Sequence, residues 1–425
     1  MSKNSEDIKA EVLKMGAQAR AAARALTKLS SEKKNEILRA MADSVMANEA
    51  AILEANEKDL AAADELGLTA AMKDRLRLDS ERLAAIAGGI REVADLHDPT
   101  GEIIREWDRP NGLRIQKKRT PIGVIGIIFE SRPNVTSDAA VLCFKTGNAT
   151  ILRGGKEAIH SNLALAAALQ EGGAPAGLPD HSIQLIPFTD RESVRYMAEM
   201  DKYLDLIIPR GGAGLIEAVV SMARMPVIKH YDGICHVYVD KQADLDMAED
   251  ITVNSKIQKP SVCNALETLL IHKDIAPQFA PRIAQNLSAK NVELRGDEKF
   301  RELCGIDSVK EATDADWTEE YLDYILAVKV VDDLDAAISH INHYGSHHTE
   351  SIVTGDEAAA EKFQLECDSA TVFWNASTRF SDGGEFGFGA EIGISTDKLH
   401  ARGPMALEEL TSYKYLVFGD GQLRG

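Results

Sequence analysis

The stretch GVIGIIFESRPNVTSDAAVLCFKTGNATILRGGKEAIHSN, residues 123–162, decides the fold class of this chain. An apolar, β-branched run at 122–129 precedes an amphipathic segment near 137–146, and a second run at 149–152 precedes another amphipathic segment at 156–170. Short β-rich runs that alternate with segments of helical periodicity indicate parallel strands joined by right-handed crossover helices. The stretch therefore predicts a doubly wound α/β sheet.

The same alternation continues beyond this stretch, after about 97 residues of helical periodicity without visible chemistry. Three more strands of the first sheet are expected at 182–187, 205–208 and 227–229. A second α/β series has expected strands at 236–240, 265–272, 325–331, 350–354 and 370–374. We therefore expect two doubly wound α/β domains.

Composition excludes several classes of protein. The 425 residues carry 48 Lys+Arg against 67 Asp+Glu, a net charge of −19, so phosphate backbones and anionic membranes are repelled. No apolar run approaches the roughly 20 residues that a membrane span requires. Five scattered cysteines form neither a disulfide framework nor a Cys-x-x-Cys pattern. These features predict a soluble, cytoplasmic protein with reduced thiols and no nucleic-acid partner.

Two expected strand ends are suited to a phosphorylated ligand. Each combines cations and glycines just before a helix: Arg153-Gly154-Gly155-Lys156 and Arg210-Gly211-Gly212. Helix N-termini and glycine amides favour anions, and ligands of doubly wound sheets bind at the carboxyl ends of strands. A glycine-rich turn alone is as often a mere tight turn. The presence of two such turns in one sheet favours a dinucleotide or another phosphate ligand.

Cys263 differs from the other cysteines in its setting. Cys143 and Cys235 fall within or beside apolar elements, which is typical of buried small hydrophobes. Cys263 follows a Pro-Ser break, and Lys256 and Lys259 lie nearby in the sequence. Such an electropositive setting favours a thiolate.

The densest histidine cluster comprises His340, His343, His347 and His348. No Cys, Asp or Glu lies at metal-ligand spacing beside it, so we expect a solvated helix end rather than a metal site.

Four long stretches resemble one family: residues 123–162, 230–240, 260–272 and 386–422. They are similar to the γ-glutamyl phosphate reductases, within the aldehyde dehydrogenase superfamily, and the resemblance covers essentially the whole chain. Ala406 and Glu409 stand where we expect glycines in this family. The resemblance implies an aldehyde-dehydrogenase-like fold of two doubly wound α/β domains with a small β oligomerisation element. The implied domains are an NADP-binding domain at 1–228 with a β arm near 102–121, a catalytic domain at 229–402 and a closing tail at 403–425.

The resemblance also implies a reaction. Enzymes of this family reduce L-glutamyl 5-phosphate to L-glutamate 5-semialdehyde with NADPH and release phosphate, the second step of proline biosynthesis from glutamate. Cys263 matches the superfamily's nucleophile, which forms a thioacyl enzyme. The backbone amide of Cys263 and the side chain of Asn134 are the implied donors to the oxyanion.

Residues for the cofactor carry over from the superfamily in the same way. Arg153 matches a lysine near the adenosine ribose, and Lys156 stands where NAD-preferring members often have glutamate, so NADP is favoured. Gly211 matches the glycine of a second turn facing the pyrophosphate. Glu320 matches a glutamate that holds the nicotinamide ribose.

Lys229 aligns with the glutamate that activates water in oxidising, hydrolytic aldehyde dehydrogenases. Because lysine is a poor base for water, this replacement favours an acyl-phosphate enzyme over that first alternative. A second alternative is a non-enzymatic scaffold, which the retained Cys263, Arg153 and glycine turns disfavour. A third is a cysteine hydrolase, which requires His230 or His236 close to Cys263.

Two kinds of protein partner are expected. An extended, charged ribbon at 114–121 and a closing strand at 413–418 resemble the superfamily's oligomerisation elements, so a homo-oligomer is predicted. The second expected partner is the upstream glutamate 5-kinase, which would pass on the labile acyl phosphate by channelling.

Overall fold

The computed structural model describes residues 5–229 and 231–424, which form two compact units. The first comprises Met1–Lys229, Phe388–Gly393 and Met405–Gly425, and the second comprises His230–Gly387 and Ile394–Pro404. In the described part of the chain, no helix has the length and apolarity needed to cross a bilayer. The functional domains expected at 1–228, 229–402 and 403–425 stay a prediction.

The first unit begins with helices, as expected. They are α1 (Ser5–Leu26), α2 (Ser31–Ala47), α3 (Glu49–Ala62), α4 (Ala70–Leu76) and α5 (Ser80–Asp95). Side-chain caps start three of them: Ser30 Oγ accepts from the amide of Lys33 at 3.2 Å, Thr69 Oγ1 accepts from the amide of Met72 at 3.2 Å, and Asp79 accepts from the amide of Arg82 at 2.8 Å. Ile37, Met41 and Val45 recur at helical spacing and are fully buried.

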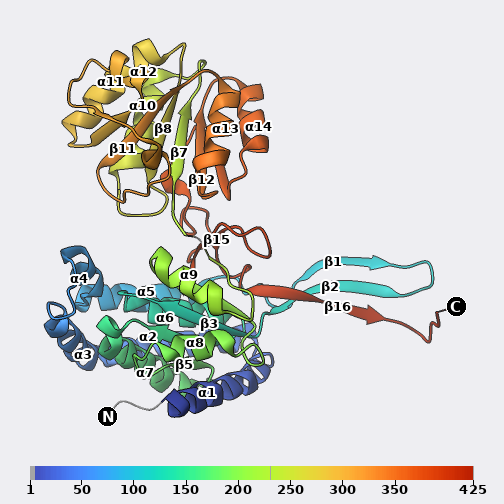
Figure 1. Cartoon of the computed structure of the whole chain (residues 1–425). Coiled ribbons are helices and arrows are strands. Elements are labelled where there is room, and N and C mark those ends of the chain that lie inside the picture. Colours follow the sequence, from blue (N-terminus) through green and yellow to red (C-terminus); the bar gives the residue numbers. More distant parts are fainter. Residues whose placement is uncertain (1–4, 230, 425) are drawn as a thin grey trace. The chain divides into compact units, whose positions relative to one another are not determined.

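The first unit contains a four-stranded parallel sheet in the order β5-β4-β3-β6 (Figure 1). Its strands are β3 (Val124–Phe129), β4 (Ala149–Gly154), β5 (Ile183–Leu185) and β6 (Leu206–Arg210). The crossover segments are α6 (Asn134–Lys145), the 3₁₀ helix η1 (Lys156–Ala158) with α7 (Ile159–Ala176), and α8 (Glu192–Glu199), while α9 (Ala213–Met222) follows β6. The strand order reverses beside β3, so the topological switch point lies at the carboxyl ends of β3 and β6.

The prediction of a strand at 227–229 is wrong. Val227 makes only an isolated bridge to Ile207, next to Pro226. Because Pro226 has no amide hydrogen, it cannot extend the ladder.

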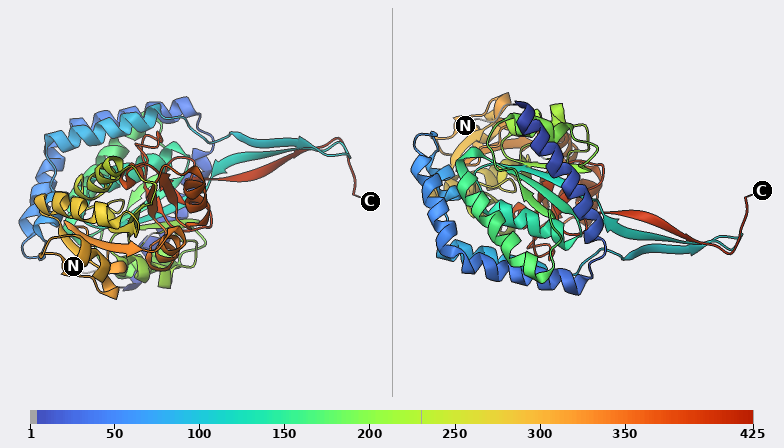
Figure 2. Two further views of the ribbon diagram at one scale, coloured as in Figure 1. Left: turned by 90° about the horizontal axis from the view of Figure 1, so that it is seen from above. Right: turned by 90° about the horizontal axis from the view of Figure 1, so that it is seen from below.

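A three-stranded antiparallel ribbon projects from the body of the first unit (Figures 1 and 2). It comprises β1 (Ile103–Asp108), β2 (Arg114–Pro121) and β16 (Thr411–Phe418), in the order β1-β2-β16. Tyr413, Tyr415 and Val417 of β16 are exposed. The extended segments predicted at 114–121 and 413–418 are therefore confirmed as strands.

The second unit contains a seven-stranded parallel sheet in the order β10-β9-β11-β8-β7-β12-β13. Its strands are β7 (Cys235–Val239), β8 (Leu266–His272), β9 (Glu293–Gly296), β10 (Lys310–Glu311), β11 (Ile325–Val331), β12 (Thr349–Val353) and β13 (Thr371–Trp374). Its helices are α10 (Leu245–Ile257), α11 (Ala276–Ala289), α12 (Glu298–Leu303), α13 (Leu334–Tyr344), α14 (Glu357–Glu366), and the 3₁₀ helices η2 (Asp314–Trp317) and η3 (Thr378–Phe380). Strands β14 (Gly393–Ser395) and β15 (Gly403–Met405) pair in the tail. Strands β9 and β10 were not expected, because Glu293, Arg295, Lys310 and Glu311 interrupt any apolar run there.

Candidate active site

Cys263 lies in the loop between α10 and β8 and is half-buried. Within residues 5–229 and 231–424, its backbone amide has no hydrogen-bond partner, so this N–H is available to an oxyanion. Its carbonyl oxygen accepts from the thiol of Cys235 at 3.2 Å. Burial raises the pKa of Cys143 to about 12 and that of Cys235 well above its ordinary value, so both are inert thiols, as predicted.

Gly233 joins the Cys263 loop to Glu320. A Cβ atom on Gly233 would overlap the carbonyl group of Cys263, so only glycine allows this close approach. The amide of Gly233 donates to Oε1 of Glu320 at 2.8 Å. The pKa of Glu320 is raised above its ordinary value, because burial outweighs the opposite effect of this hydrogen bond. Sequence reasoning did not assign Gly233 a role, although it lies in the matched stretch 230–240.

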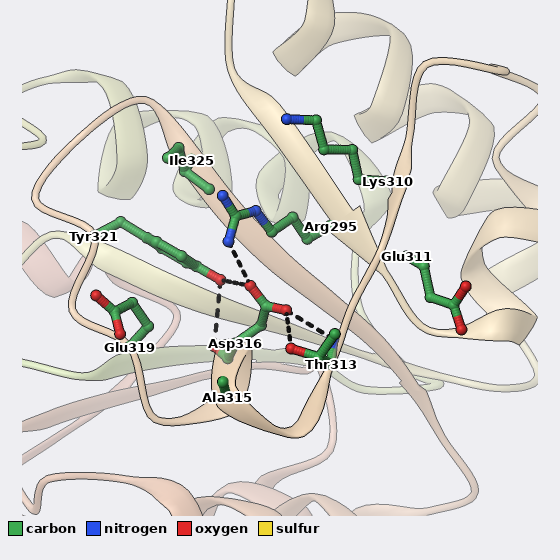
Figure 3. Close-up of a pocket in the computed structure, with 9 residues that line it drawn as sticks. All are labelled: Arg295, Lys310, Glu311, Thr313, Ala315, Asp316, Glu319, Tyr321 and Ile325. Atoms are coloured by element: carbon green, nitrogen blue, oxygen red, sulfur yellow. Dashed lines mark hydrogen bonds and ion pairs between the residues drawn. The ribbon is translucent and has the colours of Figure 1, made fainter.

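A network of charged groups supports the segment that carries Glu320 (Figure 3). The hydroxyl of Tyr321 donates to Asp316 at 2.8 Å, and Arg295 donates to the same carboxylate at 2.7 Å. Burial acts to raise the pKa of Asp316, but Arg295 and the other donors outweigh it and hold the pKa at about 2. These residues line a cavity of about 500 Å³, whose cations Arg295 and Lys310 are already paired with acidic side chains.

The expectation that Lys256 makes the thiol's surroundings electropositive is wrong. Its ammonium group forms an ion pair with Glu267 at 2.7 Å, and both side chains are essentially inaccessible to solvent. Glu267 also accepts from the amide of Leu322, two residues after Glu320, at 3.2 Å. Lys256 is therefore neutralised and supports the Glu320 segment, whereas Lys259 is exposed.

His236, one of the two candidate partners, does not pair with Cys263. His236 is fully buried and directs Nδ1 at Glu350, 2.9 Å away. We predicted that the histidine cluster is a solvated helix end, and this prediction is wrong for His340 and His348, which are buried. Burial lowers the pKa of His340 to about 2. The described residues contain no group of three or more metal-ligating side chains. His230 lies outside the described residues.

The first unit contains a cavity of about 400 Å³ beside the carboxyl end of β4. Of the predicted cofactor residues, the structure brings three together there: Arg153, Gly155 and Lys156. It adds lining residues that sequence reasoning did not assign to a site: Glu130, Glu157, Thr189, Arg191, Val194, Gly214, Leu215, Ala218 and Met222. Most of these lie on loops or on α8 and α9, where single polar residues give no periodic signal.

The turn after β4 is tightly packed. Arg153 is buried, and its guanidinium donates to the carbonyl of Thr189 at 2.9 Å. A Cβ atom on Gly154 would overlap the side chain of Asn162, and one on Gly155 would overlap Glu157. Lys156 remains exposed at the cavity, with its ammonium group available to an anion.

The turn after β6 already holds a carboxylate. Oε2 of Glu130 accepts from the amide of Gly212 at 3.1 Å, and a Cβ atom on Gly211 would overlap the same side chain. Arg210 packs against Gly393 of the tail. Arg210, Gly211 and Gly212 do not line the cavity, and their role in binding the cofactor stays a prediction.

Asn134 and Lys229 belong to the first unit, whereas Cys263 belongs to the second. Asn134 begins α6, and its amide donates to Asp138 at 2.8 Å. Burial raises the pKa of Asp138 to about 6, against the bond from Asn134. Lys229 is partly exposed. Their roles beside Cys263 stay predictions.

Comparison with known proteins shows to which family the chain is related. The model of the aldehyde dehydrogenase family matches residues 2–323. The chain is 56% identical to the γ-glutamyl phosphate reductase of Geotalea daltonii over 414 residues, 97% of this chain and 99% of that protein. The crystal structure of γ-glutamyl phosphate reductase from Thermotoga maritima superposes with a TM-score of 0.95 at 45% identity, covering 98% of this chain and 100% of that one. An engineered glycolyl-CoA reductase with bound NADP⁺, 16% identical, shares the fold with a TM-score of 0.66 over 96% and 97% of the two chains.

A parallel sheet with a glycine-rich cavity, and a loop that presents a half-buried cysteine, define an oxidoreductase of the aldehyde dehydrogenase family. Within that family, the chain belongs to the γ-glutamyl phosphate reductases. The predicted family and the aldehyde-dehydrogenase-like α/β fold are confirmed.

Proposed function

We propose that this enzyme reduces L-glutamyl 5-phosphate to L-glutamate 5-semialdehyde with NADPH and releases phosphate, as the second step of proline biosynthesis. The observation that carries the proposal is the Cys263 loop, in which a half-buried thiol and an uncommitted amide are tied through Gly233 to Glu320. Membership of the family supports the substrate, and the free thiols support a cytoplasmic setting.

In this mechanism the thiolate of Cys263 attacks the acyl carbon and phosphate leaves, which gives a thioacyl enzyme. The amide of Cys263 and the side chain of Asn134 donate to the oxyanion. Bound NADPH supplies the hydride that reduces the thioester. Cys263 then leaves the resulting thiohemiacetal as the semialdehyde forms.

The residues of the first unit fit a phosphorylated dinucleotide. Lys156 and Arg191 line the cavity with Arg153, and their three positive charges outnumber the two carboxylates of Glu130 and Glu157 there, which supports binding of a 2′-phosphate. In the second unit, Glu320 accepts from the amide of Gly233 at 2.8 Å, and its match to the superfamily's glutamate supports a role at the nicotinamide ribose.

Phosphate dependence is the direct test of this function. The protein is incubated with glutamate semialdehyde, phosphate and NADP⁺, and formation of NADPH is followed by absorbance. We expect reduction only when phosphate is present. Turnover without phosphate would instead indicate the hydrolytic aldehyde dehydrogenase.

Lys156→Glu tests the choice of cofactor. The substitution removes a cation from the cavity and adds an anion, so NADPH binding should weaken by about 1–3 kcal/mol while NADH is less affected. Titration of each cofactor by fluorescence measures both affinities. An equal loss for the two cofactors would show that Lys156 does not contact the 2′-phosphate.

Lys229→Ala tests the residue at the position of the water-activating carboxylate. A cation beside the thiol and the phosphate should speed labelling of Cys263 by iodoacetamide and assist phosphate binding. The variant should therefore label more slowly at neutral pH, and its KM for phosphate should rise. Lys229→Glu should in addition permit slow oxidation without phosphate. Unchanged labelling and phosphate KM in the alanine variant would leave Lys229 with a surface role only.

We further propose a homo-oligomer that pairs through the ribbon, because β16 is an edge strand with an apolar, exposed face. Tyr415→Asp with Val417→Asp should shift the protein to a smaller species in light scattering, with its melting temperature nearly unchanged. Ser412→Asp, an exposed residue of the same strand, is the control. A wild-type protein that is monomeric would contradict the proposal.

A second proposed interaction is with glutamate 5-kinase, which would hand over the labile acyl phosphate directly.

A further inference from the structure

A short turn of the second unit is bonded to the loop that carries the nucleophile. In η3, the hydroxyl of Thr378 donates to the carbonyl of Asn264 at 2.8 Å. In return, the amide of the Asn264 side chain donates to the carbonyl of Ser381 at 2.9 Å. Asn264 and Thr378 are both buried, and Asn264 directly follows Cys263. The backbone of Arg379, between Thr378 and Ser381, is therefore fixed beside the nucleophile.

The side chain of Arg379 is held at the start of the same loop. Its Nε donates to Oε1 of Gln258 at 2.8 Å. Among the residues that the structure describes, its terminal nitrogens Nη1 and Nη2 have no hydrogen-bond partner. The bond to Gln258 fixes the Nε edge of the guanidinium, and Nη1 and Nη2 remain available to a ligand.

The surroundings of this guanidinium indicate an anion. Burial lowers the pKa of Arg379, whereas the negative charges of Asp382 and of a Cys263 thiolate act to raise it. Because the residues on both sides of Arg379 are bonded to Asn264, which directly follows Cys263, Arg379 lies close to the nucleophile. Within the described residues, neither Asp382 nor any other carboxylate forms an ion pair with Arg379, whose one side-chain hydrogen bond is that of Nε to Gln258.

We propose that Arg379 binds the phosphoryl group of the acyl phosphate through Nη1 and Nη2. This inference rests on the proposed function and extends it, because it assigns the group that recognises the leaving phosphate. A dianionic phosphate matches the planar pair of donors of a guanidinium. The phosphate is attached to the carbon that Cys263 attacks, whereas the α-carboxylate lies at the far end of the glutamyl chain. Because Arg379 lies close to Cys263, the phosphate is favoured over the α-carboxylate as its ligand.

The chemistry of the first step gives Arg379 a catalytic task. Sγ of Cys263 forms a bond to the acyl carbon, and the bond between that carbon and the phosphate oxygen breaks. The electron pair of the broken bond leaves with the phosphate, which then takes a proton from water. Negative charge therefore grows on the group that Arg379 contacts, so the interaction strengthens toward the transition state.

The test is the reverse reaction, with phosphate varied at saturating semialdehyde and NADP⁺. Arg379→Gln should raise the KM for phosphate by about 10–100-fold, through loss of a charge-assisted contact, and leave the KM for NADP⁺ nearly unchanged. Arg379→Lys keeps the charge without the paired donors and should give a smaller rise. Lys273→Gln, which removes an exposed cation beyond the opposite end of β8, should change neither constant.

A second readout does not depend on turnover. Inorganic phosphate should protect Cys263 of the wild-type protein from iodoacetamide, and protection should require much more phosphate in both Arg379 variants. If Arg379→Gln fails to fold, Arg379→Lys carries the same comparison.

Three results separate the possible failures. A wild-type enzyme that reduces NADP⁺ without phosphate refutes the proposed function itself. A phosphate-dependent wild type with an unchanged phosphate KM in both Arg379 variants overturns this inference. A raised KM for the semialdehyde alone also overturns it, and assigns Arg379 to the α-carboxylate.

Discussion

Replacement of Cys263 by alanine is expected to reduce phosphate-dependent turnover by about 10⁴-fold or more, because no other thiol can form the thioacyl enzyme. The other four cysteines of the chain are buried. Burial also raises the pKa of Cys143, Cys235 and Cys367, so none of these three is a thiolate at neutral pH. Initial rates of NADPH formation measure the loss, and NADP⁺ titration should show that cofactor binding is retained.

Cys143→Ala is the matched control for this variant. Cys143 lies within α6 and is fully buried, so its removal should cost about 1–2 kcal/mol of stability through a small cavity and leave the turnover intact. Retention of turnover in Cys263→Ala would contradict the assigned nucleophile. A comparable loss in both variants would point to a folding defect.

Most of the fold could be predicted from the sequence because the strands of both sheets are apolar runs. Strands β3, β8 and β11 are mostly buried and consist mainly of β-branched and aliphatic residues, the pattern of a parallel sheet covered on both faces. Strand β9 was missed because it alternates charged residues near the edge of its sheet. Val227 was wrongly placed in a strand because its apolar neighbours outweighed Pro226.

The candidate site was predicted less completely than the fold. Cys263 could be found because it stands at the end of an element and matches a family motif. Lys256 was misread because the sequence shows a nearby cation but not its partner Glu267, which the next strand brings into contact. Gly233 and Arg379 act through contacts with the Cys263 loop that are distant in sequence, and no periodic pattern reports such contacts.

Lys256→Met is expected to destabilise the second unit strongly, by about 3–5 kcal/mol. The substitution leaves the carboxylate of Glu267 buried without its cation, and breaking a buried pair costs more than the pair contributes. Burial already raises the pKa of Glu267 to about 7, against the charge of Lys256, so the variant should raise it further. Urea unfolding monitored by circular dichroism measures the free energy of unfolding.

The pH dependence distinguishes this cause from a packing defect. A carboxyl group whose pKa is raised in the folded state binds more protons there than in the unfolded chain. The stability of Lys256→Met should therefore fall as pH rises from about 4.3, the ordinary pKa of glutamate, through the raised folded value. The loss relative to the wild type should be smaller at pH 6 than at pH 8. An equal loss at both values would contradict the argument.

The double variant Lys256→Met with Glu267→Leu separates stability from function. It replaces both charges by apolar groups of similar volume, so it should recover most of the lost stability and lose the dependence on pH. It still lacks the carboxylate that accepts from the amide of Leu322 and so holds the Glu320 segment. The KM for NADPH should therefore be raised in the stable double variant, while labelling of Cys263 by iodoacetamide stays near the wild-type rate. A double variant with wild-type NADPH affinity would show that Glu267 stabilises the fold without positioning Glu320.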